Sequence, residues 1–268
     1  MSRGNLFWGF VLILVGVLFL LSTTGLIKGV NLWDLIWPTF LIAIGLWILF
    51  GNLLGRRFAG GLRVGEVVIP LEGASSARVK ISHGAGRLTL DRPAAAGELL
   101  SGSFAGGLIY KLNRRGSEVE VKMRPPDYAF RFVNWGWSHG LDWSFGLSRD
   151  IPLSLEVGTG ASESILDLTD LRVTELQLHT GASSTKVSLP ANAGFTRVTC
   201  EAGVAGLELR VPSNVAGRIR YRGGLSSINV DTSRFPHAGG VYQSVDYDTV
   251  ANKVDIDVQM GVGSVDIR

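Results

Sequence analysis

The chain has 268 residues, of which 46% are hydrophobic and 18% are charged. Its formal net charge is +3, but residues 1–65 hold five Lys or Arg and one Asp, and the remaining 21 basic and 22 acidic residues nearly cancel. A nucleic-acid-binding module concentrates positive charge on its soluble part, so this distribution argues against nucleic acid as a partner. The single cysteine, Cys200, excludes an internal disulfide and a cysteine-built zinc site.

Two long apolar segments, residues 6–27 and 32–54, begin the chain, and only residues 28–31 separate them. Each segment is long enough to cross the roughly 30 Å hydrocarbon core of a bilayer as a helix. A secretory signal peptide has one short apolar region followed by a cleavage site, which differs from this pattern. We therefore expect residues 1–57 to form a retained transmembrane helical hairpin, with the lipid bilayer as a partner.

Basic residues at the ends of the two segments indicate an orientation. Arg3 precedes the first segment, and Arg56, Arg57 and Arg63 follow the second. Because Lys and Arg near span ends are retained on the cytoplasmic side, both termini and the domain after the hairpin are predicted to be cytoplasmic at the plasma membrane. The expected membrane-interface anchors lie at or near the span ends and are Trp8, Trp33, Trp37, Arg56 and Arg57.

After a linker and first strand at residues 58–75, residues 76–268 repeat one pattern six times. An alternating apolar strand is followed by a glycine, a small residue two positions later, and a second alternating strand. Alternation such as that of residues 207–211 (LELRV) places one set of side chains in a core and the other in solvent. The four middle copies are spaced about 21 residues apart, which is typical of a solenoid whose coils stack on one another. The sequence predicts an all-β fold, a single β-solenoid in which each coil stacks on the next.

Each copy has a glycine at the same place, which indicates a turn with positive φ or a backbone too close to its neighbour for a Cβ. These predicted turn glycines are Gly84, Gly160, Gly181, Gly203, Gly224 and Gly261. The repeat is degenerate at residues 99–123, where we expect a hairpin that turns at residues 113–116. An insertion precedes the last copy, and residues 243–247 are expected to belong to an extra strand or hairpin.

Residues suited to catalysis or metal binding do not cluster in the sequence. The four histidines stand on different loops and strand ends, and none has a second ligand at metal-binding spacing: His83, His139, His179 and His237. Glycine pairs such as Gly84 and Gly86 precede no helix that could bind a phosphate. Cys200 alternates in phase with Val198, which places it in the core. We expect no catalytic residues, no metal site and no cofactor.

One aromatic segment, residues 128–145, interrupts the repeats and holds three of the seven tryptophans. Its Trp135, Trp137, Trp143 and Phe145 are the candidate contact patch, because Trp dominates both membrane interfaces and protein hot spots. The alternative is that these rings pack against an open end or side of the solenoid.

Together, the two parts of the chain resemble a known family. Residues 6–9 (LFWG), Gly16, residues 32–38 (LWDLIWP) and residues 41–46 (LIAIGL) resemble the transmembrane hairpin of LiaF-type bacterial membrane proteins. The glycine-punctuated strands resemble the toast-rack β-solenoid found behind such anchors. The resemblance implies a non-enzymatic regulator of cell-envelope stress signalling, and some family members restrain a partner histidine kinase. Members with a characterised partner often carry four spans, whereas this sequence shows two.

These observations favour a membrane-anchored sensor or modulator of envelope stress that acts through protein or membrane contacts. Its expected partners are a sensor kinase or another membrane protein, and a homo-oligomer is a further expectation. A structural scaffold or adhesin, in which the solenoid is a stiff spacer, is the alternative. An enzyme is disfavoured because the sequence has no acid–base or nucleophile constellation.

Overall fold

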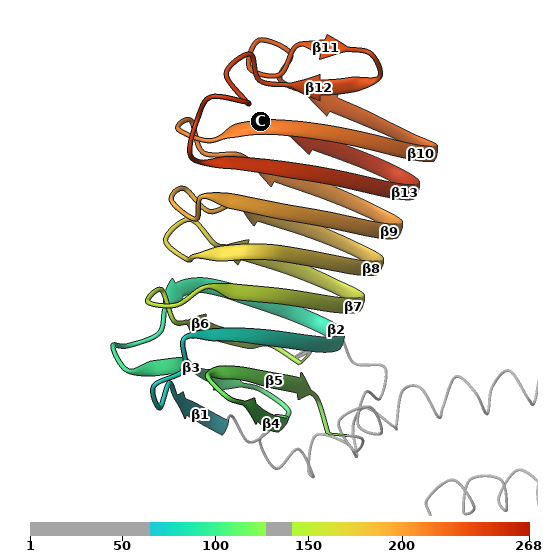
Figure 1. The fold of residues 1–268 in the computed structure, drawn as a ribbon. Coiled ribbons are helices and arrows are strands. Elements are labelled where there is room, and N and C mark those ends of the chain that lie inside the picture. The colour runs from blue at the N-terminus through green and yellow to red at the C-terminus, as the bar shows by residue number, and fades with distance from the viewer. Residues whose placement is uncertain (1–64, 127–140) are drawn as a thin grey trace, which may run out of the picture. The chain divides into compact units, whose positions relative to one another are not determined.

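The computed structural model describes residues 65–126 and 141–268, which form thirteen strands and no helix. Figure 1 labels the strands. Their bounds are β1 (Gly65–Pro70), β2 (Ser76–Pro93), β3 (Glu98–Phe104), β4 (Ile109–Arg115), β5 (Glu118–Arg124), β6 (Trp143–Leu147), β7 (Leu153–Asp167), β8 (Val173–Ser188), β9 (Phe195–Arg210), β10 (Ala216–Val230), β11 (His237–Ala238), β12 (Val241–Gln243) and β13 (Lys253–Ile267). Within these ranges no helix is long and apolar enough to span a membrane. The expected spans at residues 6–27 and 32–54 lie outside the described residues. The chain divides into two units, Met1–Gly61 and Leu62–Arg268.

Six long strands correspond to the six sequence repeats, and they are all-parallel neighbours in the order β2-β7-β8-β9-β13-β10. Each is a single continuous strand of 15 to 18 residues that contains the repeat glycine near its middle. Figure 1 shows each one doubling back on itself at one edge of the stack. The expected turn between two strands is therefore a bend within one strand, which separates a first arm from a second arm.

The core lies between the two layers formed by the first and second arms. Inward positions stack in columns along the solenoid, and every member of the first-arm column is at most 1% exposed: Leu155, Leu176, Val198, Ile256 and Ile219. The matching second-arm column holds Leu166, Val187, Leu209, Ile267 and Val230. Burying such side chains contributes about 1.5 to 3 kcal/mol each, and no coil has enough inward residues to form a core alone.

The stacking order differs from the chain order at the C-terminal end. We expected each coil to stack on the next, but β13 lies between β9 and β10. This order has a consequence for charge. In the shared register Asp255 of β13 lies between Arg197 of β9 and Arg218 of β10, which would otherwise face each other as like charges. Asp255 also accepts a 2.6 Å hydrogen bond from the hydroxyl of Tyr247, in the segment that leads into β13.

Different elements flank the two ends of the stack. At the β2 end, β5 pairs with the first arm of β2 and β6 with its second arm, and β3 and β1 continue the sheet beyond β6. The predicted hairpin in this region exists as β4 and β5, which turn at Gly116 with a φ of +61°. At the β10 end, the β11–β12 hairpin pairs with β10 only at Arg218 and Ile219. This second hairpin ends at Gln243, so it precedes most of residues 243–247, where we expected it.

Candidate functional site

The six repeat glycines form a column along the bends. None of them has a positive φ, so the first explanation for the glycines does not hold in the structure. The second explanation fits the geometry: a Cβ on Gly160 would lie 2.4 Å from the carbonyl oxygen of Gly84, and one on Gly181 would lie 2.9 Å from that of Gly160. Because real Cβ atoms do not approach backbone this closely, neighbouring coils require glycine at these positions.

A groove runs along this line of bends. It has a volume of about 690 Å³, and residues from β7, β8, β9, β13 and β10 line it. Gly181, Gly203 and Gly261 contribute backbone without side chains to the groove. The exposed side chains around it form a polar row, two positions before the glycines, that consists of His179, Glu201, Gln259 and Arg222.

The polar row is held by ion pairs between neighbouring coils. His179 Nδ1 lies 3.2 Å from Glu201 Oε2, and Arg222 Nη2 donates to Asp257 Oδ1 at 3.1 Å. These side chains are 45 to 67% exposed, apart from the less exposed Asp257, so solvent screens the pairs and they contribute little to stability. The Glu201 carboxylate and the Arg222 guanidinium remain accessible at the groove.

An apolar row follows the glycines directly, on the outer side of the bend. In stacking order its members are Ala85, Ala161, Ala182, Val204, Val262 and Leu225. The side chains grow toward the β10 end, and there Val204 is 60%, Val262 44% and Leu225 83% exposed. We call these last three residues the apolar ridge. Three large apolar side chains on adjacent coils form a contiguous exposed stripe that the core does not need.

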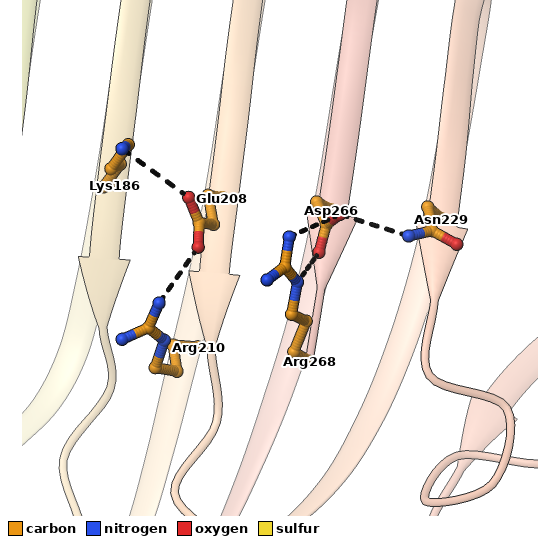
Figure 2. Close-up of polar contacts among 6 residues, drawn as sticks. All are labelled: Lys186, Glu208, Arg210, Asn229, Asp266 and Arg268. Carbon is orange, nitrogen blue, oxygen red and sulfur yellow. Dashed lines mark hydrogen bonds and ion pairs between the residues drawn. The ribbon is translucent and has the colours of Figure 1, made fainter.

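A second polar cluster lies on the outward face of the second arms. Figure 2 shows Glu208 and Asp266, two carboxylates that are register neighbours on β9 and β13. Each has its own cation: Arg210 lies 3.2 Å from Glu208, and Arg268 donates to Asp266 at 2.7 Å. Hydrogen bonds from Arg268 and Asn229 lower the pKa of Asp266. These contacts offset a like-charge pair within the sheet, which is a structural role rather than a binding site.

The structure buries two members of the predicted contact patch. Trp143 and Phe145 are each 1% exposed, and both rings pack against Phe104, with ring centroids 5.3 and 5.9 Å away. Neither ring is accessible to a partner, so for these two residues the packing alternative agrees with the geometry. Trp135, Trp137 and His139 lie outside the described residues, and the patch as a whole stays a prediction.

His83 is buried beside this aromatic group at the first bend of the stack. Its Nε2 donates to the carbonyl oxygen of Leu141 at 2.7 Å, and its ring centroid lies 5.1 Å from that of Trp143. Burial lowers the pKa of His83. Within the described ranges His83 Nδ1, Trp143 Nε1 and Thr159 Oγ1 have no hydrogen-bond partner.

Other reactive side chains in the described residues are dispersed. No group of three His, Cys, Asp or Glu side chains in the described ranges is arranged to hold a metal ion. Cys200 is 1% exposed, as its alternation with Val198 predicted. Burial, with a smaller contribution from Asp257, raises the pKa of the Cys200 thiol to about 12, which leaves it protonated and unreactive.

The comparisons with known proteins agree with this architecture. Residues 59–210 match the family described as the N-terminal domain of toast_rack, DUF2154. The chain belongs to this toast-rack family. Residues 6–49 match the LiaI-LiaF-like transmembrane region, so this is a membrane-anchored protein of LiaF type. No curated protein matches the chain.

The toast-rack fold is similar to solved structures. A candidate cell adhesion protein from Clostridium sporogenes has a TM-score of 0.69 and 19% identity over 76% of this chain and 98% of that chain. At this identity the likeness shows the fold alone. A candidate adhesin from Bacteroides fragilis covers 78% of this chain and 98% of that chain, but its TM-score of 0.28 and 6% identity carry no argument.

Most of the apolar ridge lies beyond the residues that match the toast-rack family. The match ends at Arg210, whereas Leu225 and Val262 belong to the last two coils. Sequence reasoning missed the ridge because it placed these residues in the predicted turns, between the repeat glycine and the small residue that follows it. The available signal was the position directly after each repeat glycine, where alanine gives way to valine and leucine in the later copies.

Proposed function

We propose that this toast-rack protein is a non-enzymatic sensor or modulator of cell-envelope stress signalling that acts by contact with another membrane protein, such as a sensor kinase. The groove along the bends supports this proposal. It crosses five coils, it offers a carboxylate and a guanidinium, and the glycine column below it is closely packed. A site on rigid strands presents its groups to a partner in a constant arrangement, which lowers the entropic cost of binding.

Blocking the groove tests this function. Gln259→Trp places a large side chain in the groove, and Ser264→Trp is a matched control because Ser264 is also exposed on β13 but does not line the groove. We expect the full chain with Gln259→Trp to lose its effect on an envelope-stress reporter in the source bacterium, and the control to keep it. If both variants regulate the reporter like the wild type, the groove is not the contact site.

Identification of the partner requires a covalent probe. A photo-reactive amino acid at Gln259 should crosslink a sensor kinase in native membranes, and the same probe at Ser264 should not. If the crosslinked species contains no signalling protein, the regulatory proposal fails even where the groove is occupied.

A scaffold or adhesin is the second candidate, favoured by the fold shared with the candidate cell adhesion protein of Clostridium sporogenes. In this case the solenoid is a rigid spacer, and its length matters more than its groove. Replacement of β7–β9 by the same number of coils lacking His179 and Glu201 should then preserve function, whereas a groove-dependent modulator should lose it.

The orientation of the chain is part of the proposal. Arg56 and Arg57 after the second apolar segment favour a cytoplasmic solenoid. A reporter fused after Arg268 should therefore indicate cytoplasm, and one inserted within residues 28–31 should indicate the outside. An external signal from the C-terminal fusion would place the solenoid, and its stimulus, outside the cell.

A further inference from the structure

We propose that the apolar ridge binds the ridge of a second copy of this chain around a two-fold axis that passes between the two Val262 side chains. The ridge has the symmetry that such a contact needs. Val204, Val262 and Leu225 occupy one register position on β9, β13 and β10, so Val262 lies one strand spacing, about 4.8 Å, from each of the others. A two-fold axis along the strand direction places Val262 against itself and Val204 against Leu225 of the second copy.

The polar row follows the same symmetry and supplies charge complementarity. Glu201, Gln259 and Arg222 lie three residues before the ridge residues on the same three strands. The axis that places Val262 against Val262 of the second copy also places Gln259 opposite Gln259, and Glu201 opposite Arg222 of the second copy. Both charged side chains are more than half exposed, and the solvent-screened pairs that they make with His179 and Asp257 can exchange for pairs across the contact. An isologous contact therefore has an apolar centre and two opposite-charge pairs at its rim.

These charges favour a second copy over a lipid surface as the occupant. Surfaces that insert apolar side chains into a bilayer usually surround them with Lys and Arg, which the anionic headgroups attract. The ridge is bordered by both a carboxylate and a guanidinium, which suits a self-complementary contact and opposes binding to anionic lipid. Because the chain is membrane-anchored, two copies meet at a high effective concentration, and a small contact suffices for association.

The contact goes beyond the proposed function and does not depend on it, but the two share residues. Glu201 and Arg222 also line the groove, so a second copy on the ridge would cover part of it. Self-association and binding of another protein would then compete. The experiment below contains only this chain, so its failure would leave the groove experiments unaffected.

Cysteine crosslinking of the full chain in reconstituted membranes tests the axis. Cys200 stays in place because it is buried. Val262→Cys should form disulfide-linked dimers under mild oxidation, and Asp167→Cys, an exposed control at the end of β7, should not. Differently tagged chains with Val204→Cys and Leu225→Cys should crosslink to each other more efficiently than either chain to itself.

Charge reversal tests the register. Glu201→Arg or Arg222→Glu alone should decrease Val262→Cys crosslinking by roughly tenfold, since each change turns two opposite-charge pairs into repulsions. The double variant, Glu201→Arg with Arg222→Glu, should restore it. Circular dichroism of each variant establishes that the strands remain folded, and the double variant separates repulsion from misfolding.

Three results would overturn the proposal. Val262→Cys that crosslinks no more than Asp167→Cys excludes contact at this residue. Leu225→Cys that crosslinks to itself as well as to Val204→Cys excludes the two-fold register. Monomeric chains whose ridge is labelled by a lipid-soluble photo-probe would assign the ridge to the membrane.

Discussion

The two ends of the stack bury their outermost coils to different extents. At the β2 end both arms of β2 are paired, and Trp143, Phe104 and Phe145 fill the space beneath them. At the β10 end a short hairpin pairs with two residues of β10, and Leu225 is 83% exposed. A solenoid needs caps because its terminal coils present unpaired edges and apolar faces. The closed end has the features of a stability element, and the open end those of a contact surface.

The glycine column does not share this difference between the ends. A Cβ at Gly160 would lie 2.4 Å from the backbone of the preceding coil, whereas a Cβ at Gly203 would lie 3.3 Å from it. At the other end of the stack, a Cβ on Gly261 would lie 2.8 Å and one on Gly224 3.0 Å from the backbone of the neighbouring coil. The approach is therefore closest at Gly160 and widest at Gly203, and the distinction between the two ends rests on their caps and on the exposed apolar ridge.

Truncation of the aromatic core should have the largest effect. Trp143→Ala should destabilise the solenoid by about 3 to 5 kcal/mol, because it removes a fully buried ring and leaves a cavity. Leu225→Ala, the control at the open end, should change stability by less than about 0.5 kcal/mol. Native-state hydrogen exchange of the strand amides in the full chain measures both free energies. Equal protection in the two variants would remove the distinction between the ends.

A methyl group in the glycine column should have a smaller and graded effect. Gly160→Ala should cost about 1 to 3 kcal/mol because the coils must move apart, and Gly203→Ala should cost less. Gly206→Ala is the control, since a Cβ there meets nothing within 4 Å. The melting temperatures of the full chain in detergent should rank Gly160→Ala lowest and Gly206→Ala nearest to wild type. A reversed ranking would show that the close approach of neighbouring backbones is not the reason for glycine at these positions.

Protonation of His83 at the closed end should produce the smallest effect. The pKa of His83 in the folded state is below its ordinary value of 6.5 because burial opposes the charged form. The unfolded chain therefore binds the proton more readily, and the contribution of His83 to stability is present above about pH 6.5 and is lost as the pH falls toward the lowered folded value.

His83→Gln should remove this pH dependence while keeping a side-chain donor for the carbonyl of Leu141. Across this pH range the melting temperature of the variant should change less than that of the wild type. An equal decrease in melting temperature on acidification in both proteins would assign the effect to other groups.

Local sequence determined much of this protein. Alternation identified the inward residues, as in residues 207–211. Successive side chains of a strand point to opposite faces, whatever the strand packs against. The repeats predicted the solenoid, and the placing of Cys200 in its core was confirmed, since each follows from the neighbours of a residue along its own strand. The two apolar segments pointed to a membrane anchor, which agrees with the match at residues 6–49.

Contacts between coils were decided only by tertiary structure. The order of the sequence does not contain the position of β13 between β9 and β10, which places Asp255 between two arginines. The need for glycine at Gly160 arises from the carbonyl of Gly84, 76 positions earlier in the chain and one coil away in space. The apolar ridge is formed by Val204, Val262 and Leu225 in a shared register, whereas in the sequence they are three separate residues, each following a glycine. Stacking along the solenoid axis brings such residues together. The repeat spacing predicts that the coils stack, but it does not give their order in space, which depends on contacts between coils.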